Sequence, residues 1–137
     1  MTEVFLDSGA FVAYLVRSDR LHAETVQLFA HPPSRWCTSV LVVSESYSWF
    51  LHKLGEESAR TFRAFLRSLS NLRVLPADEE HLEAVWKKLD RLRGSKLTLT
   101  DASSLVLLEE RGIVTVWGTD HHLAIEGATV VPGSALA

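Results

Sequence analysis

Short apolar segments alternate with longer helical segments along this chain, and this alternation constrains the fold more than any other feature of the sequence. The apolar run from Glu3 to Leu6 ends at Asp7, and a helical pattern follows it from Gly9 to Val16. Short apolar strands that alternate with helices are typical of a parallel sheet covered by helices on both faces. The sequence therefore predicts an α/β fold, namely a three-layer α/β/α sandwich with a central, mainly parallel sheet.

The alternation continues to the end of the chain. Further strands are expected at residues 36–38, 72–75, 113–117 and 129–131. Helices are expected at residues 22–30, 40–54, 56–71, 79–91, 100–111 and 121–126. Ser39, Asp78 and Thr100 stand where N-caps of three of these helices are expected, and Gly55 and Gly112 stand where two of them should end.

Length and composition indicate one globular unit. A chain of 137 residues, 47% hydrophobic and 23% charged, has the size and apolar content of one domain with its own core, so residues 1–137 are expected to form a single domain. No apolar stretch approaches the roughly 18 to 20 residues of a membrane span, and the first residues lack a signal-peptide pattern. We therefore expect a soluble, cytoplasmic protein with no membrane association.

The single cysteine, Cys37, excludes an internal disulfide framework and a zinc site built on several thiolates.

Four carboxylates stand at the ends of strands or on otherwise apolar helices. Asp7 and Asp120 each follow a predicted strand, and ligands of parallel α/β sheets bind beyond the carboxyl ends of the strands. Asp101 shares a helical face with leucines, and Glu45 lies in a helix that is apolar nearly all round. A carboxylate in apolar surroundings is costly unless something pairs with it. Each of these four acids therefore needs a partner.

A shared divalent cation would satisfy all four acids together. Carboxylate oxygens are natural ligands of Mg²⁺ or Mn²⁺, and such sites position and activate a water for attack on a phosphodiester. Taken singly, each acid has a simpler explanation. Asp7 can cap the following helix, Asp101 can be a first-turn acid behind Thr100, Glu45 can be a solvated side chain, and Asp120 can be a loop residue. Those explanations weaken jointly, because four independent accidents would have to reproduce the pattern of an acidic metal site.

The segments that carry these acids resemble a known family. They are Val4 to Ala10, the helix with Ser44-Glu45, Leu97 to Ala102, and Val114 to Asp120, which together cover nearly the whole chain. In this set the sequence is similar to a PIN domain of the VapC toxin type. The resemblance implies a PIN-like fold and an Mg²⁺- or Mn²⁺-dependent endoribonuclease that is paired with an antitoxin and forms a homodimer.

The resemblance also assigns site residues. It implies that Asp7, Glu45, Asp101 and Asp120 are the catalytic, metal-binding acids and that Ser8 is the small hydroxyl residue after the first Asp. The last motif departs from the family pattern, which commonly has Thr two residues before the Asp and an aromatic residue three after it. The chain has Gly118 and Leu123 at these positions, and Thr119 is the candidate for the auxiliary hydroxyl.

The net charge of −3 shows that the whole molecule is not an electrostatic trap for nucleic acid, so RNA contacts would have to come from local patches. Residues 81–100 carry a local excess of basic side chains, and Arg60, Arg63 and Arg67 share one helical face. Both patches can equally be solvated surface. Specificity for a particular RNA would lie in groove shape and in loops such as 17–21 and 93–99.

His121 and His122 are adjacent, but the sequence disfavours a zinc site at this pair. Neighbouring side chains on one element are expected to point apart, and no Cys or His at ligand spacing joins them. A role for one of them near the scissile phosphate stays open.

Two other function classes stay open beside hydrolysis of RNA. One is a phosphoacceptor signalling module, which shares the α/β pattern, although the chain lacks an acidic pair after the first strand. The other is a non-catalytic interaction domain in which the acids serve only as helix caps. Chelator-sensitive RNA cleavage would separate these classes.

Overall fold

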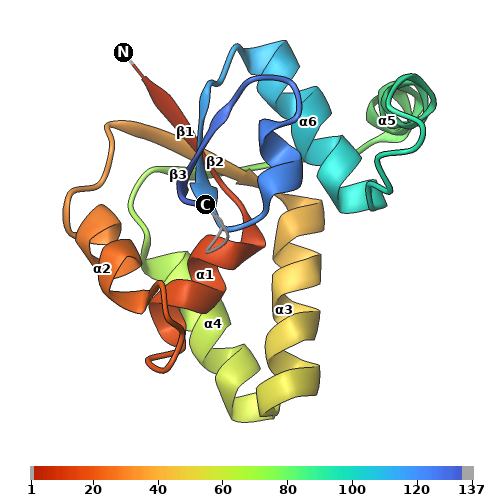
Figure 1. Ribbon diagram of the computed structural model, residues 1–137. Coiled ribbons are helices and arrows are strands. Elements are labelled where there is room, and N and C mark those ends of the chain that lie inside the picture. Colours follow the sequence, from red (N-terminus) through yellow and green to blue (C-terminus); the bar gives the residue numbers. More distant parts are fainter. Residues whose placement is uncertain (1, 134–137) are drawn as a thin grey trace.

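A computed structural model describes residues 2–133 and confirms the predicted α/β architecture (Figure 1). Five parallel strands form one sheet in the order β3-β2-β1-β4-β5. The strands are β1 (Glu3–Leu6), β2 (Arg35–Ser39), β3 (Leu72–Leu75), β4 (Thr115–Gly118) and β5 (Thr129–Pro132). The helices are α1 (Ser8–Leu15), α2 (His22–Ala30), α3 (Val40–Leu54), α4 (Glu56–Ser68), α5 (Glu79–Arg91) and α6 (Leu99–Arg111), followed by the short 3₁₀ helix η1 (His121–Ala124).

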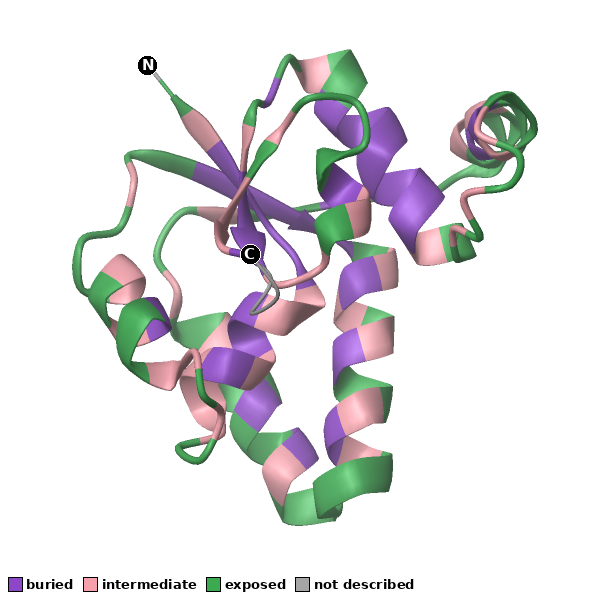
Figure 2. Ribbon diagram, in the orientation of Figure 1, coloured by how far each residue is buried: buried purple, intermediate pink, exposed green. Residues whose placement is uncertain are grey.

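Helices cover both faces of the sheet. Figure 1 shows α1, α2 and α4 on one side and α5 and α6 on the other, while α3 extends away from the sheet beside α4. The core contains side chains from the strands together with residues of α1, α3, α4 and α6. Figure 2 shows α6 as strongly buried and α5 as largely exposed, and residues 101–108 of α6 are all buried. Among the residues that the structure describes, none of the helices has the length and apolar character needed to cross a bilayer.

The sequence-based boundaries hold with small corrections. The predicted helix at 56–71 ends at Ser68, because Leu69 adopts an extended conformation. The predicted strand at 113–117 begins only at Thr115, because Gly112 ends α6 in a left-handed conformation and the Ile113 amide still donates to the Leu108 carbonyl. Ser39 and Asp78 cap α3 and α5 as expected, each accepting a backbone N–H three residues on.

The expected cap of α6 was wrong. Thr98, not Thr100, is the N-cap residue, and its hydroxyl accepts the Asp101 amide N–H at 3.0 Å. The Asp101 carboxylate in turn accepts the Thr98 amide N–H at 3.2 Å, which completes a reciprocal capping box. Asp101 therefore fixes the start of α6 as well as lying close to the other acids.

Candidate functional site

The strand order brings Asp7 and Asp120 to one edge of the sheet. β1 and β4 are parallel neighbours, with Leu6 opposite Trp117, so the residues that follow both strands lie side by side. The Asp7 amide donates to the Trp117 carbonyl at 2.9 Å, which extends the pairing one residue beyond β1. The prediction that both acids lie at the carboxyl ends of strands is confirmed.

Two glycines allow this close approach. A Cβ on Gly9 would lie 2.2 Å from Thr119 Oγ1 and 2.8 Å from the Thr119 backbone nitrogen. A Cβ on Gly118 would lie 3.0 Å from Asp7 Cβ. Only glycine fits these two positions without displacing the Thr119 backbone or Asp7. The sequence reasoning missed this role, although the signal was present in the glycines that flank the Asp7-Ser8 and Thr119-Asp120 pairs.

The helices α3 and α6 supply the other two acids. Ser8 Oγ donates to Glu45 Oε1 at 3.0 Å, which ties the start of α1 to α3 and orients the glutamate. Asp101 lies in the first turn of α6 and faces Asp120 closely enough for the two carboxyl groups to form a hydrogen bond when one is protonated. The structure therefore brings together all four acids that the sequence singled out; we call them the acidic cluster.

The acidic cluster adjoins a cavity of about 270 Å³. Its lining includes Asp7, Ser8, Gly9, Glu45, Thr119 and Asp120, together with Val12, Asp19 and Trp49. Sequence reasoning did not assign Asp19 or Trp49 to the site. Trp49 lies one helical turn beyond Glu45 on α3, so the i,i+4 spacing was a signal that could have placed it there.

Burial and mutual repulsion perturb the acidic cluster. Asp7 is only 4% exposed, and burial, reinforced by the negative charges of Glu45, Asp120 and Asp101, raises its pKa to about 7 despite a hydrogen bond from the Ser8 amide. Burial also raises the pKa of Glu45 and of Asp101, with nearby carboxylates adding to the effect in both cases. Three of the four acids therefore resist ionisation in the protein alone.

Asp120 is perturbed in the opposite direction. Burial alone would raise its pKa, but the backbone N–H and ring of His122, together with Asp101, outweigh burial and lower it. The His122 amide donates to Asp120 Oδ1 at 2.9 Å, so Asp120, for which a loop residue was the simpler explanation, is the N-cap of η1. Asp7 differs, because it stands at the N-cap position of α1 but its side chain makes no capping hydrogen bond.

The donor set of the acidic cluster suits a hard divalent cation. Within residues 2–133, no Lys or Arg forms an ion pair with any of the four acids, and the only cation-capable partner is the His122 ring on Asp120. A buried carboxylate with no paired positive charge is unfavourable in its ionised form. Carboxylate oxygens at a partly open cavity match the ligand preference of Mg²⁺ or Mn²⁺. The residues present therefore fit such an ion.

One of the five basic side chains in the predicted patch at residues 81–100 is buried, and the other four are exposed. Lys88 is 3% exposed and donates to Glu109 and to Glu126, the latter at 2.7 Å. Arg91 pairs with Glu126 as well, at 2.7 Å. Two of the basic side chains in this segment are thus engaged in ion pairs that tie α5 to α6 and to the loop after η1. Lys87, Arg93 and Lys96 are exposed, so a phosphate contact by these three residues stays a prediction.

The chain matches the PIN domain over residues 4–125. Among solved structures, the VapC20 toxin of Mycobacterium tuberculosis, described as cleaving the sarcin-ricin loop, superposes with a TM-score of 0.84 at 23% identity, covering 92% of this chain and 96% of that one. The DNA-bound VapBC complex of Salmonella typhimurium superposes with a TM-score of 0.62 at 20% identity, covering 95% and 97% of the two chains. FitAcB from Neisseria gonorrhoeae superposes with a TM-score of 0.67 at 15% identity, covering 93% and 95%. No curated protein sequence matches the chain.

The family match has a structural basis in the chain. It runs from the second residue of β1 through η1 and includes all four acids of the acidic cluster. The superposed structures share the parallel sheet and its helical layers over nearly the whole chain. The protein belongs to the PIN domain family.

Proposed function

We propose that this protein is a divalent-metal-dependent endoribonuclease that acts as the toxin of a toxin–antitoxin pair. The observation that carries the proposal is the gathering of four carboxylates without a Lys or Arg partner, within residues 2–133, at the carboxyl edge of a PIN-type sheet. The described activity of VapC20 supports RNA as the substrate class. We further propose that residues 1–137 form a single PIN domain.

Each acid has a distinct task in this proposal. Asp7 is the buried anchor of the cluster, and Asp101 couples it to the capped start of α6. Glu45 lines the cavity from α3 and is held in place by a hydrogen bond from Ser8. Asp120 is already held as the carboxylate by His122. Together they would hold Mg²⁺ or Mn²⁺, which when bound supplies charge neutralisation at the phosphodiester and activation of water.

The rim of the cavity offers contacts for the RNA backbone. Asp19 lines the cavity, and its neighbours Arg17 and Arg20 are exposed in the loop between α1 and α2. Guanidinium groups bind phosphate in a bidentate manner and would position the strand without reading its sequence. Thr119, which lies directly against Gly9 and lines the same cavity, is the candidate for an auxiliary hydroxyl.

Cleavage of RNA by the purified protein tests the proposal. We expect cleavage in Mg²⁺ or Mn²⁺ that stops on addition of a chelator. Asp7→Asn and Glu45→Gln should abolish cleavage while leaving a folded protein, because each removes a charge from the cluster and keeps the side-chain size. Asp90→Asn, at an exposed position of α5, is the matched control and should remain active. Chelator-resistant cleavage, or wild-type rates in both cluster variants, would refute the mechanism, and absence of any cleavage would favour a non-catalytic interaction domain.

An antitoxin partner follows from the same proposal. Several of the superposed structures are toxin–antitoxin complexes, which supports a partner protein for this chain. We propose that the partner covers the acidic cavity, where a basic side chain can take the place of the cation. Expression of the protein alone should slow growth, and co-expression of its partner should relieve this effect. Such a role places the protein in the cytoplasm with its RNA substrate.

We also propose a homodimer, and an apolar face of the molecule supports it. Leu82 and Trp86 are exposed one turn apart on α5. Leu82 lines a hollow of about 460 Å³ whose lining also includes Leu41, Val85 and Leu99. Exposed contiguous apolar surface of this kind marks protein interfaces. Trp86→Glu should convert the dimer to a monomer in sedimentation experiments, and an unchanged dimer would place the interface elsewhere.

A further inference from the structure

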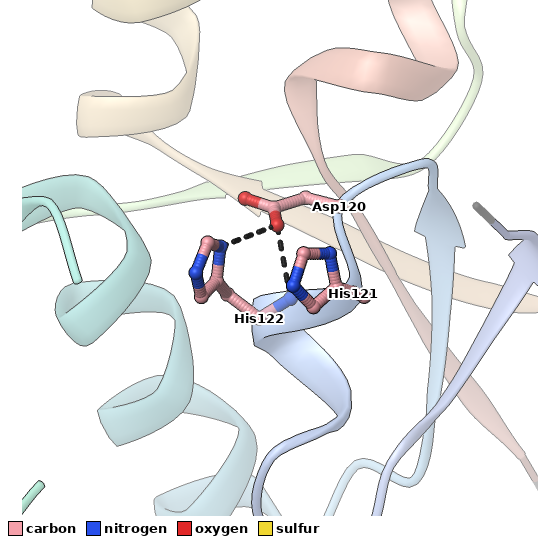
Figure 3. A group of neighbouring side chains, drawn as sticks. All are labelled: Asp120, His121 and His122. Atoms are coloured by element: carbon pink, nitrogen blue, oxygen red, sulfur yellow. Dashed lines mark hydrogen bonds and ion pairs between the residues drawn. The ribbon is translucent and has the colours of Figure 1, made fainter. Parts of the chain in front are cut away.

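A second group of potential metal ligands lies at the start of η1. One ligand atom each from Asp120, His121 and His122 can be chosen so that all three lie within 4.8 Å of one another. Figure 3 shows both imidazole rings next to the Asp120 carboxylate. The rings stack with centroids 4.5 Å apart and an angle of 27° between their planes. The expectation that these adjacent histidines point apart was therefore wrong.

Asp120 explains why the two rings converge. Its Oδ1 accepts the His122 backbone N–H at 2.9 Å and lies 2.8 Å from His122 Nδ1. The carboxylate thus holds both the backbone and the ring of His122 at the N-terminus of η1, and the exposed His121 ring rests against that fixed ring. Two imidazoles and one carboxylate oxygen consequently converge on one small region.

The donor chemistry of this group differs from that of the acidic cluster. Imidazole nitrogen with one carboxylate suits Zn²⁺ and its transition-metal neighbours, whereas Mg²⁺ prefers oxygen donors alone. Metal–ligand bonds of about 2.0–2.1 Å in a tetrahedral site place ligand atoms roughly 3.3 Å apart. The Asp120–His122 contact of 2.8 Å is already close to that spacing, and rotation of the exposed His121 side chain brings in the third ligand.

The surroundings leave room for such an ion. A hollow of about 390 Å³ adjoins both histidines, and its remaining lining residues are Ser95, Ala124 and Ile125. All three candidate ligands are partly or fully exposed, so a water can reach the ion and complete the coordination. Binding of the ion would replace the hydrogen bond between the Asp120 carboxylate and the His122 ring. Within residues 2–133, no Lys or Arg forms an ion pair with Asp120, so no such positive charge competes for this carboxylate.

We propose that Asp120, His121 and His122 form a zinc-binding site that adjoins the acidic cluster and shares Asp120 with it. The inference does not depend on ribonuclease activity, because it concerns binding of Zn²⁺ to the protein alone. Asp120 would then be a ligand in two cation sites that prefer different metal ions. Binding at one site should then change the affinity of the other, and by thermodynamic linkage the effect must be reciprocal.

Titration of the full chain with Zn²⁺, followed by calorimetry and by NMR of the histidine ring nitrogens, tests the site. Zn²⁺ should shift the ring signals of His121 and His122, whereas Mg²⁺ at the same concentration should not. His121→Ala should weaken Zn²⁺ binding by roughly tenfold or more, as loss of a ligand or its support commonly does. His52→Ala, at an exposed histidine of α3, is the matched control and should bind Zn²⁺ as wild type does.

The outcomes separate this site from the acidic cluster. Asp7→Asn removes an acid from the cluster but none of the three proposed ligands, so the ring signals should still respond to Zn²⁺. The proposal is overturned if Zn²⁺ leaves both rings unperturbed. It is also overturned if His121→Ala, whose exposed position makes a folding defect unimportant, binds Zn²⁺ with unchanged affinity. Neither measurement uses RNA, so an inactive protein does not affect the result.

Discussion

Asp7 should make the metal-free protein less stable as the pH rises, and Asp7→Asn should remove this dependence. The pKa of Asp7 is raised from 3.8 to about 7 by burial and by the neighbouring carboxylates. Between these two values the folded protein holds a proton that the unfolded chain has lost, so raising the pH favours unfolding. The penalty is absent below pH 3.8, grows through this window and is complete above about pH 7.

The size of the effect follows from the pKa difference. At about 1.4 kcal/mol per pH unit, the change in the pKa of Asp7 from 3.8 to about 7 corresponds to about 4 kcal/mol of unfolding free energy. For a chain of 137 residues this is on the order of 10 °C in melting temperature. Any cost of burying the Asn amide without a hydrogen-bond partner does not vary with pH. The difference between wild type and variant should therefore widen from pH 4.5 to pH 8 whatever the absolute stability of the variant.

Denaturant unfolding in chelator at several pH values measures this difference. Asp90→Asn is the control, because Asp90 is exposed on α5 and lies outside the cluster. Its stability difference from wild type should stay nearly constant across the pH range. If the difference between wild type and Asp7→Asn changes by less than about 1 kcal/mol between pH 4.5 and pH 8, the cluster does not perturb Asp7 in the way that we infer.

Four further variants probe other features of the fold. Thr98→Ala should lower the unfolding free energy by about 1 kcal/mol through loss of a helix cap, and it should keep the full stabilisation by Mn²⁺. Asp101→Asn should lose most of the stabilisation by Mn²⁺. Equal increases in the melting temperature of both variants on addition of Mn²⁺ would contradict this. Gly9→Ala should destabilise the protein by about 1–3 kcal/mol and reduce cleavage, because its methyl group collides with Thr119; a wild-type melt would show that the loop yields freely. Lys88→Met should leave RNA affinity unchanged, because two glutamates engage the Lys88 ammonium group. Weaker binding of RNA by this variant would show that Lys88 contributes to RNA contact.

The order of elements and the identity of the acids could be predicted because both depend on local patterns. Short apolar runs followed by helices specify a parallel sheet, and Asp7 comes directly after such a run. Which strands are neighbours depends on long-range packing, so the pairing of β1 with β4 was not predictable residue by residue. The cap at Thr98 was within reach, since Thr98 and Asp101 have the spacing of a capping box.

Side-chain partners across elements were the part that sequence reasoning could not supply. Lys88 reads as an exposed base in α5, and only the packing of α5 against α6 reveals its buried ion pairs. His121 and His122 read as divergent neighbours, and only the double hydrogen bond to Asp120 explains their convergence. The acidic residues were easier to interpret than the basic residues. A carboxylate on an apolar face is costly to bury, so the sequence alone indicates that it has a partner, whatever the tertiary structure.

The raised pKa values also predict how the acidic cluster takes up a cation. Asp7, with a pKa of about 7, holds a proton in much of the protein at mildly acidic pH, and a cation must displace it. Apparent affinity for Mn²⁺ should therefore rise with pH up to about 7, by up to roughly tenfold per pH unit for the one proton, and more steeply where Asp101 loses a proton as well. Calorimetric titration at pH 6 in buffers of different ionisation enthalpy counts the protons released. Wild type should release about one proton more than Asp7→Asn for each ion bound. Mn²⁺ binding with no proton release at pH 6, and with the same affinity at pH 6 and pH 8, would show that Asp7 is already ionised and that burial does not control the site.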